Sequence, residues 1–341
     1  MKSHNKITLP ITVVFPCRNN RIKLKDHTNS ILSWLQRVEQ VVVVDSSSDG
    51  SLDYLRERLA APHVEFYSLP PGLYQAWNFG IERARASFCY FSTVGDFISA
   101  EGLEHLYEIA SKNSIDLVLS PPRMVDVDEA PTVARWPIHE IADSLHADFF
   151  QPDRGETLRW LTCFLPFTIL GSSASNLYRT ALLKANRFPT EFSHNGDAAL
   201  GAKIAPFVKM GITKKICSRF VTHGPGREIS ADEQAETAKK FLTLLQEVSH
   251  ISPPEGAAAL AMSRSILENK ITLLEWLANL EAAVKDQKDY IEILESQNAT
   301  LREEHEVLSR MAAGIPVPFV KAGHLLSLKR FLKRKLRNRK L

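Results

Sequence analysis

The sequence predicts an α/β fold in which a mixed, mainly parallel sheet is flanked by helices and followed by one long C-terminal helix. Three observations predict it. Short apolar runs rich in β-branched residues alternate with helical segments over residues 7–119. The apolar runs are nearly continuous, as in strands buried on both faces of a parallel sheet. Over residues 257–311, apolar residues recur instead at heptad spacing, which is typical of a long helix.

The expected elements alternate along the chain. Strands are expected at 7–15, 41–44, 63–67, 88–91 and 116–119, and helices at 23–37, 52–59, 73–84 and 103–111. Beyond them, the proline-containing stretch 121–154 has little sustained period and is expected to be an insertion or flap over a site. The remaining expectations are a helix at 176–185, a helix opened by Asp197, and a late strand at 215–223. Strands alternating with helices at this spacing imply helices on both faces of the sheet.

The composition limits the classes of protein to which the chain can belong. The 341 residues are 44% hydrophobic, enough for a sizeable core. The four cysteines are far apart and form no CxxC pair, which argues against a disulfide framework and against a thiolate zinc site. No signal-peptide pattern opens the chain, and no stretch approaches the 18 or more apolar residues of a membrane span. We therefore expect a cytoplasmic location.

The positive charge is concentrated at the C-terminus. Residues 321–341 hold nine Lys and Arg and no acidic residue, so the net charge of +3 conceals an acidic body. A nucleic-acid enzyme would spread positive charge over its body, so no nucleic-acid partner is expected.

The heptad register of 257–311 predicts a coiled coil. Position a is occupied by Leu277, Val284, Ile291 and Asn298, and position d by Ile266, Leu273, Leu280, Leu294, Leu301 and Leu308. The register lapses at Lys270 and His305 in position a and at Gln287 in position d. β-Branched residues at a with leucine at d are typical of a parallel two-stranded coil. We expect a homodimer through 257–311; the alternative is a long helix that packs on its own domain.

The segment 315–341 interleaves apolar and basic residues. Leucines and Phe331 alternate with the Lys and Arg of 329–337, the pattern of a basic amphipathic helix that lies on an anionic membrane surface. We expect the protein to be peripheral on the inner face of the membrane. A solvated tail and an RNA-binding arm are the alternatives.

Polar residues gather in the loops after the expected strands. They are Arg18 and Asn19, Asp45 and Asp49, Asp96, and later Asp197 with His223 and Arg227. In an open α/β sheet, ligands bind at the carboxyl ends of the strands. The alternatives are structural: Asp49 and Asp197 as helix caps, Asp45 as a turn former, and His223 as an ordinary loop histidine.

Three segments in order carry a resemblance to a known family. They are FPCRNN at 15–20, VVVVDSSSDGS at 41–51 and PGLYQAWNFGIERARASFCYFSTVGD at 71–96. Together they resemble the family 2 glycosyltransferases of the GT-A fold, over about residues 7–227. The resemblance implies a GT-A domain at 1–250, followed by the coiled coil at 257–311 and the tail at 315–341.

The resemblance also implies roles for single residues. Asp45 would hydrogen-bond the nucleotide base, and Asp197 would be the catalytic base. Asp96, with His223 as a late ligand, would reach a Mn²⁺ or Mg²⁺ ion that bridges the two phosphates of the donor. The other residues implied to bind the donor are Pro16, Arg18, Asn19, Ser47, Asp49, Asn78, Thr93 and Gly95.

The implied function is inverting transfer of a sugar from a nucleotide-sugar donor, with UDP as the expected nucleotide. The acceptor would be a saccharide or a lipid-linked molecule in surface polysaccharide or glycoconjugate synthesis. The chain departs from the family where Thr93, Val94 and Gly95 precede the single acid Asp96. One alternative is a catalytically degenerate scaffold that dimerises and tethers partners at the membrane. Another is a sugar-phosphate nucleotidyltransferase, although the glycine-rich N-terminal loop with Arg and Lys is missing.

Overall fold

The computed structural model describes residues 8–171, 173–222 and 229–312. The chain forms a compact body, Met1–Leu274, and a second unit, Glu275–Leu341. The expected tail at 315–341 and the predicted ligand His223 lie outside the described residues.

A sheet of eight strands forms the centre of the body. In spatial order the strands are β3 (Val64–Ser68), β2 (Val38–Asp45), β1 (Leu9–Cys17), β4 (Phe88–Phe91), β9 (Asn176–Arg179), β6 (Leu117–Leu119), β10 (Met210–Thr213) and β8 (Phe149–Phe150). The first four strands run parallel, and β6 is parallel to β10. β9 and β8 run antiparallel to their neighbours. The mixed, mainly parallel sheet predicted from the sequence is confirmed.

The continuous apolar runs of the central strands are explained by burial on both faces. Side chains alternate across a strand, so neighbouring residues enter different cores. In β1, Val13 and Phe15 belong to one hydrophobic core and Val14 to the other. In β2, Val41 and Val43 join the core of Val13.

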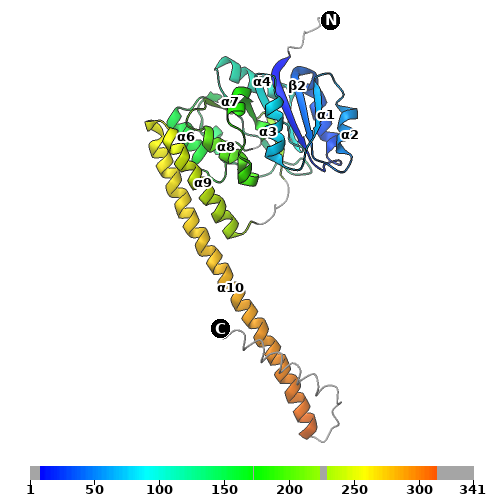
Figure 1. Ribbon diagram of the computed structural model, residues 1–341, viewed down its shortest axis with the longest axis vertical. Coiled ribbons are helices and arrows are strands. Elements are labelled where there is room, and N and C mark those ends of the chain that lie inside the picture. The colour runs from blue at the N-terminus through cyan, green and yellow to red at the C-terminus, as the bar shows by residue number, and fades with distance from the viewer. Residues whose placement is uncertain (1–7, 172, 223–228, 313–341) are drawn as a thin grey trace. The chain divides into compact units, whose positions relative to one another are not determined.

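Helices cover both faces of the sheet. One face carries α1 (Leu24–Trp34), extended by a 3₁₀ turn (Leu35–Arg37), together with α2 (Ser51–Arg58) and α4 (Ala100–Lys112). The other carries α3 (Leu73–Arg83), α6 (Arg154–Thr162), α7 (Thr180–Ala185), α8 (Gly196–Ile204) and α9 (Ala231–Ile251). Figure 1 shows α1 and α2 on one side of β2 and α3 on the other. Short 3₁₀ turns occur at Ser173–Ser175, Thr190–Asn195 and Pro254–Gly256.

A second, three-stranded sheet has the order β5 (Asp96–Ile98), β11 (Ser218–Val221), β7 (Arg123–Val125). Two expectations are corrected here. Asp96 does not lie in a loop after a strand, because it begins β5. The stretch 121–154 is not one irregular flap, because it contributes β7 to this sheet, β8 to the main sheet, and the helix α5 (Pro137–Ser144).

Two further differences concern short strands. Residues 176–185 were expected to be one helix, but the first four form β9, which pairs with both β4 and β6. The strand β10 occupies Met210–Thr213, ahead of the late strand expected at 215–223, of which only Ser218–Val221 form a strand, β11, among the described residues. The extended conformation of both segments is decided by backbone pairing inside the main sheet, because strands this short have little hydrophobic periodicity of their own.

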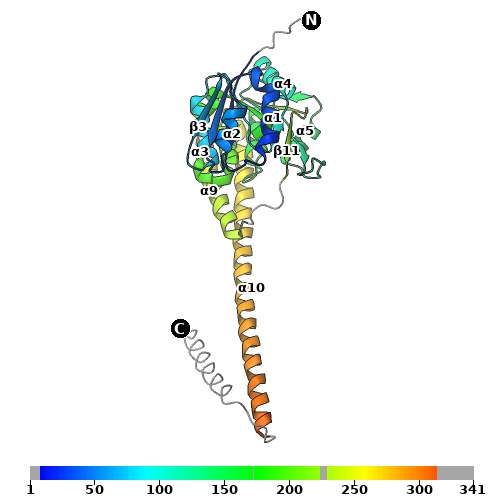
Figure 2. The same cartoon turned by 90° about the vertical axis from the view of Figure 1, so that its right-hand side faces the viewer.

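The long helix α10 (Ala257–Ala312) spans 56 residues. Its first turns belong to the body, where Leu260 and Leu267 enter the same core as Phe241 of α9. Figures 1 and 2 both show α9 alongside these turns. On another face of α10, Ile266 and Leu273 are 37% and 57% exposed. Within the body, α10 therefore carries one apolar stripe that is covered and, at the predicted heptad residues Ile266 and Leu273, a second that is exposed.

Candidate active site

The first part of the site lies where β1 and β2 end side by side. Cys17 is the register partner of Asp45, so the loops that follow the two strands begin at the same edge. Asp45 is buried, with 1% of its surface exposed. Its Oδ1 accepts a hydrogen bond from Ser47 Oγ (2.7 Å), and its Oδ2 accepts one from the Ser47 N–H (3.1 Å). Ser47 Oγ in turn accepts a bond from the Asn19 N–H (2.8 Å).

Further hydrogen bonds join the two loops. Asn19 has φ 47°, a left-handed conformation that asparagine tolerates better than most residues. Its Oδ1 accepts a bond from the Ser48 N–H (2.9 Å). Asp49 Oδ2 accepts one from the Arg21 N–H (3.1 Å), and the hydroxyl of Ser51 holds the pKa of Asp49 below its usual range. The structure thus brings the predicted residues Asn19, Asp45, Ser47 and Asp49 together, with buried Pro16 and exposed Arg18 at the end of β1.

The second part of the site surrounds Asp96. This residue is 8% exposed, and its N–H donates to the carbonyl oxygen of Thr93 (3.0 Å) across a tight turn. Gly95 within the turn has φ 102°, which a residue with a side chain rarely adopts. The hydroxyls of Thr93 and Ser173 lie 3.1 Å apart. These contacts fix the predicted residues Thr93, Gly95 and Asp96 at the carboxyl end of β4.

The described residues do not complete a metal site. No cluster of three or more His, Cys, Asp and Glu side chains suited to a metal ion occurs in 8–171, 173–222 and 229–312. Of the two predicted ligands, Asp96 is described and His223 is not. One carboxylate alone does not account for the several oxygen ligands that Mg²⁺ or Mn²⁺ takes.

The third part of the site is Asp197, in the first turn of α8. Its Oδ1 accepts hydrogen bonds from the Ala198 N–H (2.8 Å) and from the Tyr74 hydroxyl (3.1 Å). Burial raises the pKa of this carboxyl above its usual range, and the bonds from Ala198 and Tyr74 oppose that rise. A carboxylate with a raised pKa is suited to accept a proton near neutral pH.

The loop before Asp197 is shaped around Tyr74. The Tyr74 ring lies so close to Gly196 that a Cβ there would come within 2.6 Å of it. Nearby, Ser193 has φ 51° and ψ −119°. Backbone in such a sparsely populated conformation is strained and is held by its surroundings.

Asn78, the remaining predicted donor-binding residue, has a different set of contacts. Its Nδ2 donates to the Phe188 carbonyl oxygen and its Oδ1 accepts from the Phe188 N–H, both at 2.9 Å. It also lines a groove of about 800 Å³ between the 187–192 loop and α9. Through these bonds, Asn78 holds the 187–192 loop.

Two residues of this region were not predicted as site residues: Tyr74 and Ser173. Tyr74 and Asp197 are 123 positions apart, and Ser173 and Thr93 are 80 apart. Tyr74 belongs to the GLYQAWN segment, and this was the one signal in the sequence that could have indicated it.

Comparison with known proteins identifies a domain of a known family within the chain. Residues 12–178 match the model of glycosyl transferase family 2. The chain carries a family 2 glycosyltransferase domain. The matched region contains the Asp45 and Asp96 parts of the site, while Asp197 lies beyond it. No curated protein sequence matches the chain.

Solved structures show the fold of this glycosyltransferase. S. aureus TarS 1–349 superimposes with a TM-score of 0.56 at 17% identity, over 76% of this chain and 71% of that one. The same protein in complex with UDP-GlcNAc gives 0.55 at 17% identity, over 76% and 72%. The mannosyltransferase PcManGT from Pyrobaculum calidifontis, in complex with GDP-Man and Mn²⁺, gives 0.53 at 15% identity, over 81% and 76%. The body therefore has the GT-A fold.

Proposed function

We propose that this glycosyltransferase moves a sugar from a nucleotide-sugar donor to a saccharide or lipid-linked acceptor, with inversion at the anomeric carbon. One observation carries the proposal: the buried carboxylate of Asp45 at the end of β2, held by Ser47 and joined through it to the loop after β1. This is the edge at which open α/β sheets bind nucleotides. The UDP-GlcNAc and GDP-Man complexes of proteins with the same fold support a donor of this class.

In the donor complex, Asp45 accepts a hydrogen bond from the nucleotide base. Asn19, Ser47 and Asp49 shape the surface against the ribose, and Thr93 and Gly95 lie toward the diphosphate. UDP is the nucleotide we propose, and surface polysaccharide or glycoconjugate synthesis is the proposed setting.

Asp197 acts as the general base in the proposed reaction. The oxygen of the acceptor hydroxyl forms a bond to the anomeric carbon while the bond from that carbon to the diphosphate breaks, and the electron pair leaves with the diphosphate. The carboxylate of Asp197 takes the proton of the hydroxyl. Attack opposite the leaving group inverts the configuration of the sugar.

A divalent ion belongs to the proposal only as a partner in donor binding. Asp96 and His223 remain the predicted ligands of Mn²⁺ or Mg²⁺, and none of the steps above passes through the ion. Binding of UDP measured with and without Mn²⁺ tests this part.

Homodimerisation through 257–311 is proposed from the exposed heptad residues of the second unit. Leu280, Val284, Ile291, Leu294 and Leu301 are 42–59% exposed. An apolar seam of this length, with charged residues between its members, is suited to a second copy of the same helix.

Association with an anionic membrane surface on its cytoplasmic side is proposed from the sequence of 321–341. In the described part of the chain, no helix is long and apolar enough to cross a bilayer. The test is sedimentation of the full chain with vesicles that contain phosphatidylserine. Deletion of 321–341 is expected to abolish binding, and unchanged binding would contradict a membrane role for the tail.

Isothermal titration with UDP in the presence of Mn²⁺ tests the donor site. We expect the wild-type chain to bind and Asp45→Ala to lose at least about tenfold in affinity, because a hydrogen bond to a charged group is removed. Asp53→Ala is the matched control, since Asp53 is an exposed carboxylate on α2 that pairs with Arg56. Absence of nucleotide binding by the wild type would contradict the proposal and favour the scaffold.

A further inference from the structure

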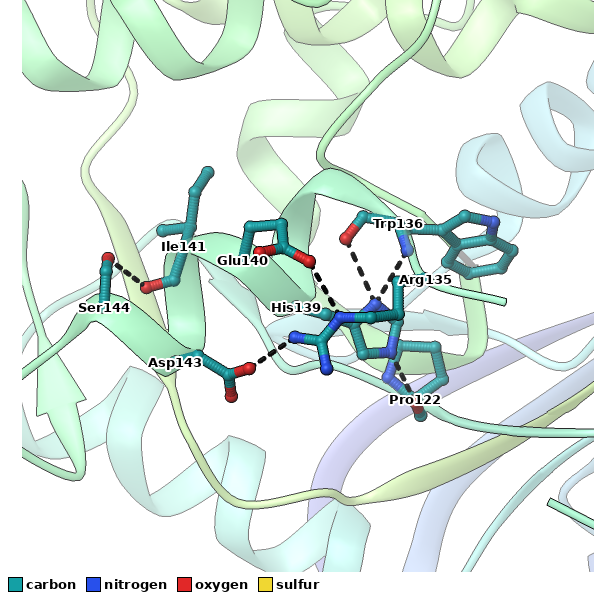
Figure 3. A network of polar contacts seen from close by, with 8 residues as sticks. All are labelled: Pro122, Arg135, Trp136, His139, Glu140, Ile141, Asp143 and Ser144. Atoms are coloured by element: carbon teal, nitrogen blue, oxygen red, sulfur yellow. Dashed lines mark hydrogen bonds and ion pairs between the residues drawn. The ribbon is translucent and has the colours of Figure 1, made fainter. Parts of the chain in front are cut away.

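Trp136 comes just before α5, and its backbone is fixed by a histidine. The Trp136 N–H donates to His139 Nδ1 (3.0 Å), and His139 Nε2 lies 2.8 Å from the Pro122 carbonyl oxygen. Because Nδ1 accepts a bond, a neutral imidazole with its proton on Nε2 satisfies both contacts. Figure 3 shows the indole pointing away from these polar contacts.

The residue before the indole is fixed as well. Arg135 pairs with Glu140 (2.8 Å) and with Asp143, which joins it to the first two turns of α5. In Figure 3 both carboxylates lie on the side of Arg135 opposite to the indole. The main chain is therefore held on both sides of Trp136, which orients its half-buried ring in advance.

The indole lies against two elements of the active site. Its ring centroid is 4.5 Å from that of Phe220 in β11. Phe220 is the antiparallel register partner of Asp96, and residues directly opposite each other in a sheet point to the same face. The ring also covers Gly171, where a Cβ would come within 2.7 Å of it, and Gly171 is two residues before Ser173, the partner of Thr93. Trp136 thus approaches the Thr93–Asp96 segment from two directions.

We propose that Trp136 is a saccharide-binding platform of this site, on whose indole the C–H face of a sugar ring packs. The inference rests on the proposed glycosyl transfer and adds a residue that contacts the sugar. A sugar ring has an apolar face and a polar rim, so a flat, rigid aromatic ring fits the face and leaves the hydroxyls free for polar partners. The sugar ring belongs either to the donor or to the acceptor, and ligand binding distinguishes the two.

The direct test is NMR of the full chain labelled with ¹⁵N at tryptophan, with the Trp136 indole signal assigned by Trp136→Phe. Three probes are added separately: UDP, a UDP-sugar that the protein hydrolyses, and methyl glycosides in the presence of UDP. A shift with the UDP-sugar but not with UDP assigns the platform to the donor sugar. A shift with the glycosides assigns it to the acceptor.

Two other outcomes would overturn the proposal in distinguishable ways. If UDP and the UDP-sugar bind but the Trp136 signal stays in place with every probe, the platform is wrong and the glycosyltransferase proposal stands. If no nucleotide or nucleotide sugar binds, both fail.

Kinetics separates a sugar contact from a packing role. Trp136→Leu keeps an apolar side chain without an aromatic face and is expected to lower kcat/KM for transfer roughly tenfold through KM, whereas Trp136→Phe stays within about threefold. The matched control is Trp160→Leu, because Trp160 is a half-buried indole in α6 that packs near Phe150. Equal losses in Trp136→Leu and Trp160→Leu, accompanied by equal falls in Tm, would overturn the platform.

Discussion

The hydroxyl of Tyr74 lies 3.1 Å from Asp197 Oδ1 and 3.1 Å from the carbonyl oxygen of His194. One side chain of α3 thereby holds both the proposed base and the strained loop that precedes it. A phenol has a single proton, so the two oxygens share one donor. Burial raises the pKa of the Asp197 carboxyl, and this hydrogen bond works against the rise.

Tyr74→Phe is expected to change how activity depends on pH. Removal of the hydroxyl leaves the effect of burial less opposed, so the pKa of Asp197 rises further. A base must be ionised to accept a proton, and the acidic limb of kcat/KM against pH should therefore move to higher pH. Tyr107→Phe is the control, since Tyr107 packs on Phe88 away from Asp197. An acidic limb that stays in place in Tyr74→Phe would contradict the role of this hydroxyl.

Ser47→Ala is expected to weaken nucleotide binding roughly tenfold, because the Asp45 carboxylate and the Asn19 N–H lose the hydroxyl that joins them. Titration with UDP measures the effect. The matched control is Ser48→Ala, since the Ser48 hydroxyl is 3.5 Å from its acceptor on Asn19 and contributes little. Equal affinities for UDP in Ser47→Ala and Ser48→Ala would show that the hydroxyl of Ser47 does not organise the loop.

His27 is expected to make the fold sensitive to acid. The ring is 1% exposed, between Phe15 and Phe97, and burial lowers its pKa from 6.5 to about 4. Between these values the unfolded chain binds the proton and the folded chain does not. The contribution of neutral His27 to the free energy of unfolding is therefore fully present above pH 6.5. It is lost as the pH falls toward 4, and the free energy of unfolding decreases by about 3 kcal/mol in total.

Urea unfolding at pH 7 and at pH 4.5 measures this contribution. The comparison is between the wild type and His27→Phe, which keeps an aromatic ring but cannot be protonated. The difference in the free energy of unfolding between the two pH values should be smaller in the variant. Identical pH dependence in both proteins would exclude His27 as the source.

The double variant Leu280→Glu with Leu294→Glu is expected to convert a dimer of the full chain into a monomer. Both leucines occupy the apolar seam of the second unit, and carboxylates there would face each other across the coil. Light scattering gives the mass, and circular dichroism checks that the body stays folded. Lys285→Ala, which lies off the seam, is the control. A wild type that is monomeric at micromolar concentration would contradict the proposed dimer.

Strong patterns in the sequence predicted the parallel half of the fold well. β1 and β2 are apolar on both faces because each contributes to two cores, and that double burial is visible as a continuous apolar run. β9 could not be recognised, because its four residues form a strand only by pairing between β4 and β6. Asn176 and its neighbours have no strand period long enough to outweigh a helical interpretation.

Some features of the candidate site could likewise be predicted from the sequence and others could not. The positions of Asp45 and Asp96 were predictable, because Asp45 ends the recognisable strand β2 and Asp96 comes shortly after the recognisable strand β4. The partners of these acids were not, since Tyr74 reaches Asp197, and Ser173 reaches Thr93, only after the chain has folded. Trp136 lies in the stretch 121–154, where prolines and short elements leave no hydrophobic periodicity. Its contact with Phe220 therefore depends wholly on tertiary packing.

Sugar transfer by the wild type and by Asp197→Asn tests the central claim most directly. The measurement is release of the nucleoside diphosphate from a panel of nucleotide sugars, together with the affinity of both proteins for UDP. We predict turnover of at least one donor by the wild type, and in Asp197→Asn a loss of about a thousandfold or more with UDP affinity unchanged, because the amide cannot accept the proton. Turnover by Asp197→Asn at the wild-type rate, or no turnover of any nucleotide sugar by the wild type, would contradict the account.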